Sequence, residues 1–81
     1  MSDRRELKLL GRIIGTYTGW DGDPGDSVWF YDFIPAEGIN LKPTDQLMFL
    51  EIEGKFQTIN EAGEVIEEWD AIETLKDVPK A

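Results

Sequence analysis

The longest apolar run in the chain, Ser27–Pro35 (SVWFYDFIP), has the length and the aromatic and β-branched composition of a β-strand. Successive side chains of a strand point to opposite faces. The expected faces are therefore Val28, Phe30, Asp32 and Ile34 on one side, and Trp29, Tyr31 and Phe33 on the other. Because both faces are rich in apolar residues, the run predicts a central strand covered on both sides, or one whose aromatic face is held out for a partner.

The second half of the chain repeats a strand-and-turn pattern. Residues 46–53 predict a strand with Leu47 and Phe49 on one face and Met48, Leu50 and Ile52 on the other. A tight turn at Gly54 leads into a more polar strand over residues 55–60, and residues 61–64 turn into a last strand over residues 65–72. Residues 73–78 predict a short helical turn or a further strand.

The N-terminal segment supports two readings. Asp3 and Glu6 resemble a capping box, and the apolar residues that follow fit one stripe of a helix. Gly11 disfavours that helix, and the β-branched and aromatic residues before Gly19 favour a strand over residues 7–18. We favour the strand, with residues 1–6 as a flexible basic arm. Residues 19–26 (GWDGDPGD) predict a loop.

Five short strands joined by glycine-rich turns predict a mainly β fold. The 81 residues form one domain. We expect an antiparallel meander, or a rolled five-stranded sheet or barrel, with the option of a short terminal helix.

Composition narrows the chemistry. The chain has no cysteine and no histidine, which removes disulfides, thiolate nucleophiles and the commonest metal ligand and general base. No segment has the apolar length of a membrane span, and the N-terminal residues lack the apolar core of a signal peptide. We expect a cytoplasmic protein with no cofactor and no membrane contact.

Charge is the strongest functional signal. The net charge is -9, yet four of the eight basic residues are Arg4, Arg5, Lys8 and Arg12. From residue 13 onward, four lysines face fifteen carboxylates. Such a body repels nucleic acid and anionic membranes and attracts basic protein surfaces or cations. Direct binding to nucleic acid is therefore not expected.

The loop over residues 19–26 is a weak candidate for calcium. Asp21, Asp23 and Asp26 supply hard oxygen ligands among glycines. The spacing departs from that of a twelve-residue calcium loop, since Asp26 stands where the sharp-turn glycine belongs and Asp32 at the last ligand position. The alternatives are a solvated turn, or a loop that presents acids to a basic partner.

Carboxylates are dense again between residues 51 and 73, with eight acids against Lys55. This density is explained by solubility, or by a surface that imitates the phosphates of nucleic acid. Catalysis is not expected, because Glu67 and Glu68 point to opposite faces of a strand and Ser27 has no histidine to activate it. Trp20 is expected to be partly exposed, and Trp29 and Trp69 to pack in the core.

These patterns predict a non-enzymatic acidic module that docks on a basic protein surface. Its most specific form is an inhibitor, of the kind that viruses encode, which blocks a nucleic-acid-binding enzyme or complex. The alternative is a small accessory or structural subunit of a larger assembly, including a homo-oligomer whose basic arm crosses to another copy. The predicted partner-binding residues are Trp20, Asp21, Asp23, Asp26, Glu67, Glu68 and Asp70.

Overall fold

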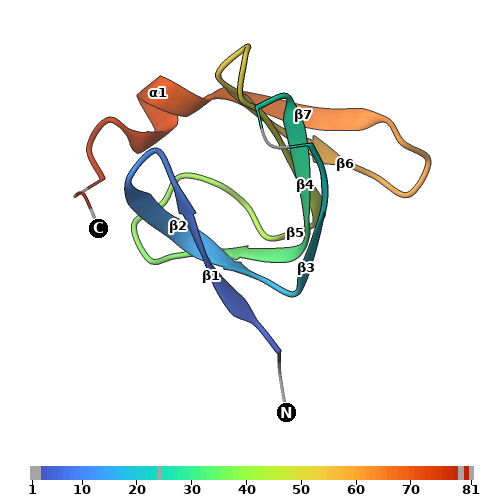
Figure 1. Cartoon of the computed structure of the whole chain (residues 1–81), viewed down its shortest axis with the longest axis horizontal. Helices are drawn as coiled ribbons and strands as arrows, with labels where there is room; N and C mark the ends of the chain where they lie inside the picture. Colours follow the sequence, from blue (N-terminus) through green and yellow to red (C-terminus); the bar gives the residue numbers. More distant parts are fainter. Residues whose placement is uncertain (1–2, 24, 79, 81) are drawn as a thin grey trace.

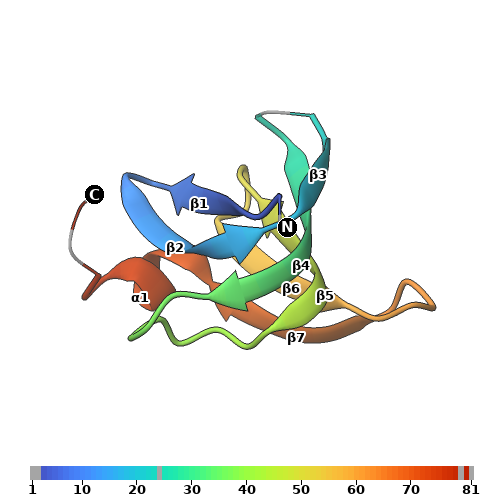
Figure 2. The same cartoon turned by 90° about the horizontal axis from the view of Figure 1, so that it is seen from below.

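The fold is a single antiparallel sheet with one short helix, seen in a computed structural model that describes residues 3–23, 25–78 and 80 (Figure 1). The elements are β1 Arg5–Leu9, β2 Arg12–Tyr17, β3 Gly19–Gly22, β4 Ser27–Pro35, β5 Thr44–Leu50, β6 Lys55–Ile59, β7 Val65–Asp70 and α1 Ala71–Leu75. The strand order is β1-β2-β4-β5-β6-β7, and β3 also pairs with β4. The predicted mainly β antiparallel meander is confirmed, with seven strands in a curled sheet that is not closed (Figure 2).

The first two strands form a hairpin. β1 pairs with β2 from Arg5–Tyr17 to Leu9–Arg12, and the chain reverses at Leu10 and Gly11, whose φ angles are 52° and 73°. The prediction of one strand over residues 7–18 was therefore wrong, although strand was the right choice over helix. Gly11 supplies the left-handed turn conformation that favours glycine.

The predicted flexible arm over residues 1–6 overlaps this hairpin. Residues 1–2 lie outside the described residues, whereas Arg5 and Glu6 belong to β1. Arg4 Nη1 donates to the Asp32 carbonyl oxygen at 2.6 Å and to Thr16 Oγ1 at 3.3 Å. Arg4 is thus bonded to residues of β2 and β4.

β2 and β3 share one edge of β4, and the pairing is interrupted between them. β2 pairs through Gly15–Pro35 and Thr16–Ile34, and β3 pairs from Gly19–Tyr31 to Gly22–Val28. The predicted loop over residues 19–26 therefore contains a strand in its first half. Its turn needs glycine at Gly22, where φ is 109° and a Cβ atom would overlap the Ser27 carbonyl oxygen.

At this interruption β4 changes the face that it buries. Asp32 has a φ of 50°, and its carboxylate accepts a hydrogen bond from Thr18 Oγ1 at 2.8 Å. Val28 and Phe30 are buried before it and Phe33 after it, whereas Ile34 is exposed. The predicted alternation through residue 34 was wrong beyond Tyr31, because the left-handed residue reverses which side chains face the core.

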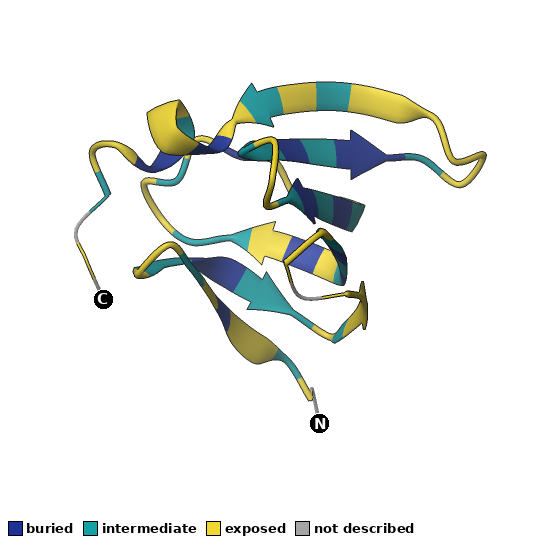
Figure 3. Ribbon diagram, turned by 45° about the horizontal axis from the view of Figure 1, so that its top comes forward, coloured by how far each residue is buried: buried dark blue, intermediate teal, exposed yellow. Residues whose placement is uncertain are grey.

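One hydrophobic core fills the concave side of the curled sheet. Figure 3 shows the buried positions alternating with half-buried ones along β5 and β6, and with half-buried or exposed ones along β4. Leu47 and Phe56 are fully buried, and Phe49 packs on Phe56 with ring centroids 5.0 Å apart. The cluster consists of Leu7, Ile14, Val28, Phe30, Phe33, Leu41, Leu47, Phe49, Phe56, Ala71 and Leu75.

The helix closes one side of this core. Asp70 caps it, since Asp70 Oδ1 accepts the backbone N–H of Glu73 at 2.9 Å. Ala71 and Leu75 point into the core. The predicted short terminal helix is thus present, and it begins two residues earlier than expected. In the part of the chain that the structure describes, no helix has the length and apolar character needed to cross a membrane.

Gly15 provides a test of the close packing between β2 and β4. A Cβ atom at this position would overlap the Ile34 carbonyl oxygen and lie 2.7 Å from the Phe33 ring. We expect Gly15→Ala to lower the free energy of unfolding by about 1–3 kcal/mol, as overpacked cores do. Urea unfolding followed by tryptophan fluorescence measures this change.

Gly19→Ala is the matched control. A Cβ atom there would lie 3.8 Å from the Tyr31 ring, which is an ordinary contact distance. We expect a change below about 1 kcal/mol. Equal stability losses in the two variants would contradict the close approach of β2 to β4.

Candidate protein-binding surface

Four strands end in one row at one end of the sheet. Ser27 pairs with Leu50, Leu50 with Lys55, and Lys55 with Asp70. The β3–β4 turn, the β5–β6 turn and the start of α1 therefore lie at this end. They carry the predicted acidic loop, and Figure 1 shows the β5–β6 turn extending beyond the strands.

The β3–β4 turn is held by its own backbone. The Asp23 N–H donates to the Ser27 carbonyl at 3.2 Å, and the Asp26 N–H donates to the Asp23 carbonyl at 3.1 Å. Asp21 Oδ1 accepts the N–H of Gly22 at 2.8 Å. The carboxylates of Asp21, Asp23 and Asp26 are exposed, so the turn presents them to solvent.

Backbone hydrogen bonds tie the neighbouring turns to this one. The Glu51 N–H donates to the Asp26 carbonyl at 2.9 Å, which joins the β5–β6 turn to the β3–β4 turn. The Ala71 N–H donates to the Gly54 carbonyl at 2.8 Å, which joins the start of α1 to the β5–β6 turn. Three segments that are distant in sequence are thus held together.

This arrangement gathers exposed carboxylates that the sequence keeps apart. We call this surface the acidic end; it consists of Asp21, Asp23, Asp26, Glu51, Glu53, Asp70 and Glu73. Lys55 lies in the same row, but its ammonium group is 3.5 Å from Glu68 Oε1. The acidic end is therefore a region of strong negative potential, which favours contact with a cationic surface.

Three exposed apolar residues stand next to these acids in the sequence. Trp20 on β3 is 51% exposed, Ile52 in the β5–β6 turn is 79% exposed, and Ile72 at the start of α1 is 70% exposed. The expected partial exposure of Trp20 is confirmed. Ile52 was assigned to a strand face, but β5 ends at Leu50 and leaves Ile52 in the turn. Apolar side chains ringed by charge are typical of protein-binding surfaces.

The predicted residues Glu67 and Glu68 have partners within the chain. Glu67 Oε1 accepts from Lys42 Nζ at 2.7 Å, which ties β7 to the loop before β5. Glu68 Oε2 accepts from Gln57 Nε2 at 2.7 Å on the opposite face. Asp21, Asp23, Asp26 and Asp70 thus belong to the acidic end, whereas Glu67 and Glu68 are engaged by Lys42, Gln57 and Lys55.

The outer face of the sheet carries a row of paired residues. Across β3 to β7 the row reads Asp21, Trp29, Met48, Gln57 and Glu68. Trp29, Tyr31 and Met48 are half-buried. The predicted aromatic face is therefore reduced to Trp29 and Tyr31, because Phe33 belongs to the core. Trp20 lies on the other side of β3, since it pairs with Phe30.

Metal binding receives no support from the geometry. Among residues 3–23, 25–78 and 80, no group of three or more acidic side chains is placed to hold a metal ion. The carboxylates of Asp21, Asp23 and Asp26 project from the turn without a common centre.

Sequence reasoning missed the part of the acidic end contributed by the β5–β6 turn. Glu51, Glu53 and Glu73 were noted only as members of a general carboxylate surface. The available signal was the segment EIEG at residues 51–54, in which an apolar residue stands between two acids beside a turn glycine.

Comparison of the chain with family models, curated proteins and solved structures finds no significant match.

The contacts of Glu68 make its titration a test of the outer face. Its pKa lies below the ordinary value, first because the Gln57 amide donates to the carboxylate and second because the Lys55 ammonium attracts its charge. A folded-state pKa below the unfolded-state value stabilises the fold above the unfolded-state pKa. That contribution is lost as the pH falls through the folded-state pKa.

We expect Gln57→Ala to raise the pKa of Glu68, as measured by carboxyl-detected NMR titration. Gln46→Ala, a change on the same face away from Glu68, is the control and should leave that titration unchanged. An unaltered Glu68 pKa in Gln57→Ala would show that the hydrogen bond does not persist in solution.

Proposed function

We propose that this chain is a non-enzymatic binding protein that docks its acidic end on a basic surface of another protein. The observation that carries the proposal is the joining of two turns and the start of α1, by the hydrogen bonds at Glu51 and Ala71, into one exposed carboxylate surface. Trp20, Ile52 and Ile72 supply apolar contact area beside those charges. Charge steers the encounter, and buried apolar side chains supply affinity.

The most specific form of the proposal is an inhibitor of a nucleic-acid-binding enzyme or complex. A groove that binds nucleic acid is lined by lysine and arginine, because it must neutralise phosphates. A rigid array of carboxylates competes for the same cations. The exposed acids on the β3–β4 and β5–β6 turns fit this role, since backbone hydrogen bonds hold the two turns side by side.

The absence of histidine and cysteine from the sequence supports a non-enzymatic role. Sixteen of the seventeen carboxylates are exposed, and Glu67 is half-buried in an ion pair with Lys42. Acid–base catalysis by carboxylates relies on an enclosed site that shifts their pKa values apart.

A second candidate function is an accessory subunit of a larger assembly, and the edge strand β7 favours it. β7 pairs with β6 on one side, and its Val65 and Ile66 are exposed. A neighbouring subunit that covered this edge would bury both side chains. A stable homo-oligomer by sedimentation, with no salt-sensitive partner, would support this function over the inhibitor.

The inhibitor proposal is tested by neutralising acids at the acidic end. The tagged protein is used to capture partners from lysate, and these are eluted in salt steps and identified by mass spectrometry. We expect a nucleic-acid-binding protein that elutes at moderate salt and loses its nucleic acid on binding. The variant Asp23→Asn/Glu51→Gln/Glu53→Gln should bind it about tenfold more weakly, since three exposed charge pairs at about 0.5 kcal/mol each amount to about 1.5 kcal/mol.

The control variant Glu6→Gln/Glu37→Gln/Asp77→Asn removes the same number of exposed charges elsewhere. It should bind within about threefold of the unmodified chain. If both variants bound the partner equally weakly, the net charge of the protein, and not the position of the acids, would determine binding. A partner that resists high salt would count against the acidic end as the docking surface.

A further inference from the structure

A groove opens at the end of the sheet opposite the acidic end. β5 and β6 pair from Leu50–Lys55 to Leu47–Thr58, and the β6–β7 register shifts between Thr58 and Ile59. Beyond this point the β6–β7 hairpin diverges from β5. The groove between them has a volume of about 830 Å³, within the range of ligand-binding clefts.

Hydrogen bonds within β5 mark the place where its registered pairing with β6 ends. The Thr44 hydroxyl donates to the Gln46 carbonyl at 3.1 Å and accepts from the Gln46 N–H at 3.3 Å. These two backbone groups point to the same side of the strand. A side chain of β5 thus bonds the backbone of β5 at the point where the registered β5–β6 pairing ends.

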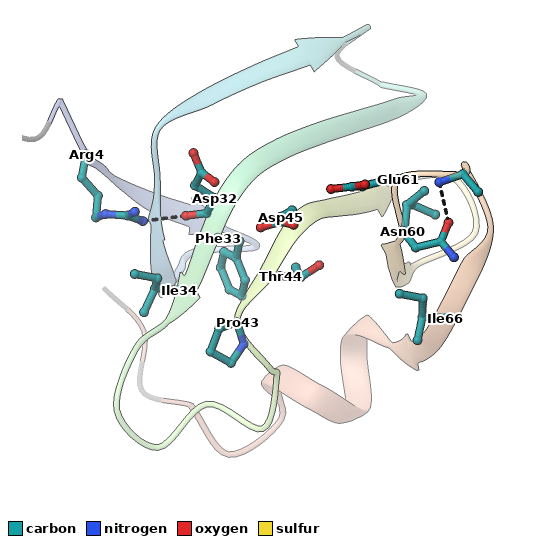
Figure 4. Close-up of a pocket in the computed structure, with 12 residues that line it drawn as sticks. Arg4, Asp32, Phe33, Ile34, Pro43, Thr44, Asp45, Asn60, Glu61 and Ile66 are labelled. Atoms are coloured by element: carbon teal, nitrogen blue, oxygen red, sulfur yellow. Dashed lines mark hydrogen bonds between the residues drawn. The ribbon is translucent and has the colours of Figure 1, made fainter.

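The floor and walls of the groove are apolar. Phe33 and Ile59 are buried beneath it, while Ile34 and Ile66 are 47% and 59% exposed on its two sides. Figure 4 shows Ile34, Phe33 and Pro43 on the side of β4 and β5, and Ile66 on the side of β7. Ile34 lines the groove because β4 changes its buried face at Asp32. Two exposed isoleucines that flank one groove form a site for an apolar side chain.

Carboxylates lie at the rim of this apolar groove. Asp45 stands on β5, and Glu61 stands on the facing β6–β7 turn, with its side chain directed toward the wall that carries Asp45 (Figure 4). Asp32 adds a third carboxylate, which accepts from Thr18. Arg4 is the basic residue in the lining, and its guanidinium group is bonded to the Asp32 carbonyl. The rim is therefore negative on balance and complements a cationic ligand.

We propose that this groove binds a short extended peptide of a partner protein, in which an apolar side chain is flanked by lysine or arginine. The apolar residue inserts between Ile34 and Ile66, and the flanking cations pair with Asp45 and Glu61. The groove lies at the other end of the strands from the acidic end, so this site is independent of the docking surface proposed above. A partner held at both ends of the sheet would gain affinity by bivalent contact.

The probe is the synthetic peptide acetyl-Arg-Lys-Leu-Val-Arg-Lys-amide, titrated into the isotope-labelled full chain and followed by NMR. We expect saturable shift changes at Ile34, Thr44, Glu61 and Ile66, with a dissociation constant below about 1 mM. Two control peptides test separately whether binding needs the apolar side chains and the cations. One replaces the apolar pair by Ser-Gly, and the other replaces the four cations by glutamate; both should bind at least about tenfold more weakly.

Variants of exposed residues test whether the peptide binds in the groove. Ile66→Ala and the double variant Asp45→Asn/Glu61→Gln should each weaken binding at least about fivefold. Val65→Ala is the matched control, because Val65 is a similarly exposed neighbour on β7 outside the groove lining. It should bind as the unmodified chain does, and unchanged spectra outside the groove show that each variant is folded.

Other outcomes would overturn the inference. Shifts confined to Asp23, Glu51 and their neighbours would assign the peptide to the acidic end. Groove shifts that depend on protein concentration without peptide would assign the groove to a second copy of this chain. No shift up to about 5 mM peptide, or equal binding of the glutamate peptide, would remove the site. These outcomes are independent of the partner-binding experiment with the acid-neutralised variant, so the two proposals can fail separately.

Discussion

The left-handed backbone at Asp32 is the constraint on which the arrangement of this sheet depends. It interrupts β4 between the segment paired with β3 and the segment paired with β2, and the Thr18 hydroxyl holds its carboxylate. By reversing the buried face it sends Phe33 into the core and leaves Ile34 at the surface. The β4 wall of the groove follows from this residue, because the strand reverses its buried face there and exposes Ile34.

At the acidic end, repulsion between carboxylates is opposed by backbone hydrogen bonds between the segments that carry them. Carboxylates on adjacent turns repel one another, and this repulsion favours separation of the turns. The hydrogen bonds at Glu51 and Ala71 oppose it. A surface whose like charges are held in place loses little conformational entropy on binding, since its backbone is already ordered. The same rigidity distinguishes these turns from a disordered acidic tail.

The fold class was predictable because alternation is clear where strands are regular. Leu47 and Phe49 face the core as their spacing indicates, and the turn glycines mark the hairpins. The alternation failed to predict the structure at two residues. Leu10 occupies a left-handed turn position that leucine rarely takes, and Asp32 reverses the alternation of buried and exposed side chains along β4. The acidity of the β3–β4 turn was visible in sequence. The pairing of Glu67 with Lys42, and the meeting of that turn with Glu51, depend on register and on contacts between distant segments.

The double hydrogen bond between Thr44 and Gln46 has a consequence for the behaviour of the protein at high concentration. Unpaired backbone groups at a strand margin template the addition of further strands, which leads to aggregation. Here the Thr44 hydroxyl bonds both backbone groups of Gln46 where the registered β5–β6 pairing ends, so these two groups already have a partner within the strand. A ligand of the proposed groove would therefore be recognised through the side chains that line it rather than through the backbone of Gln46.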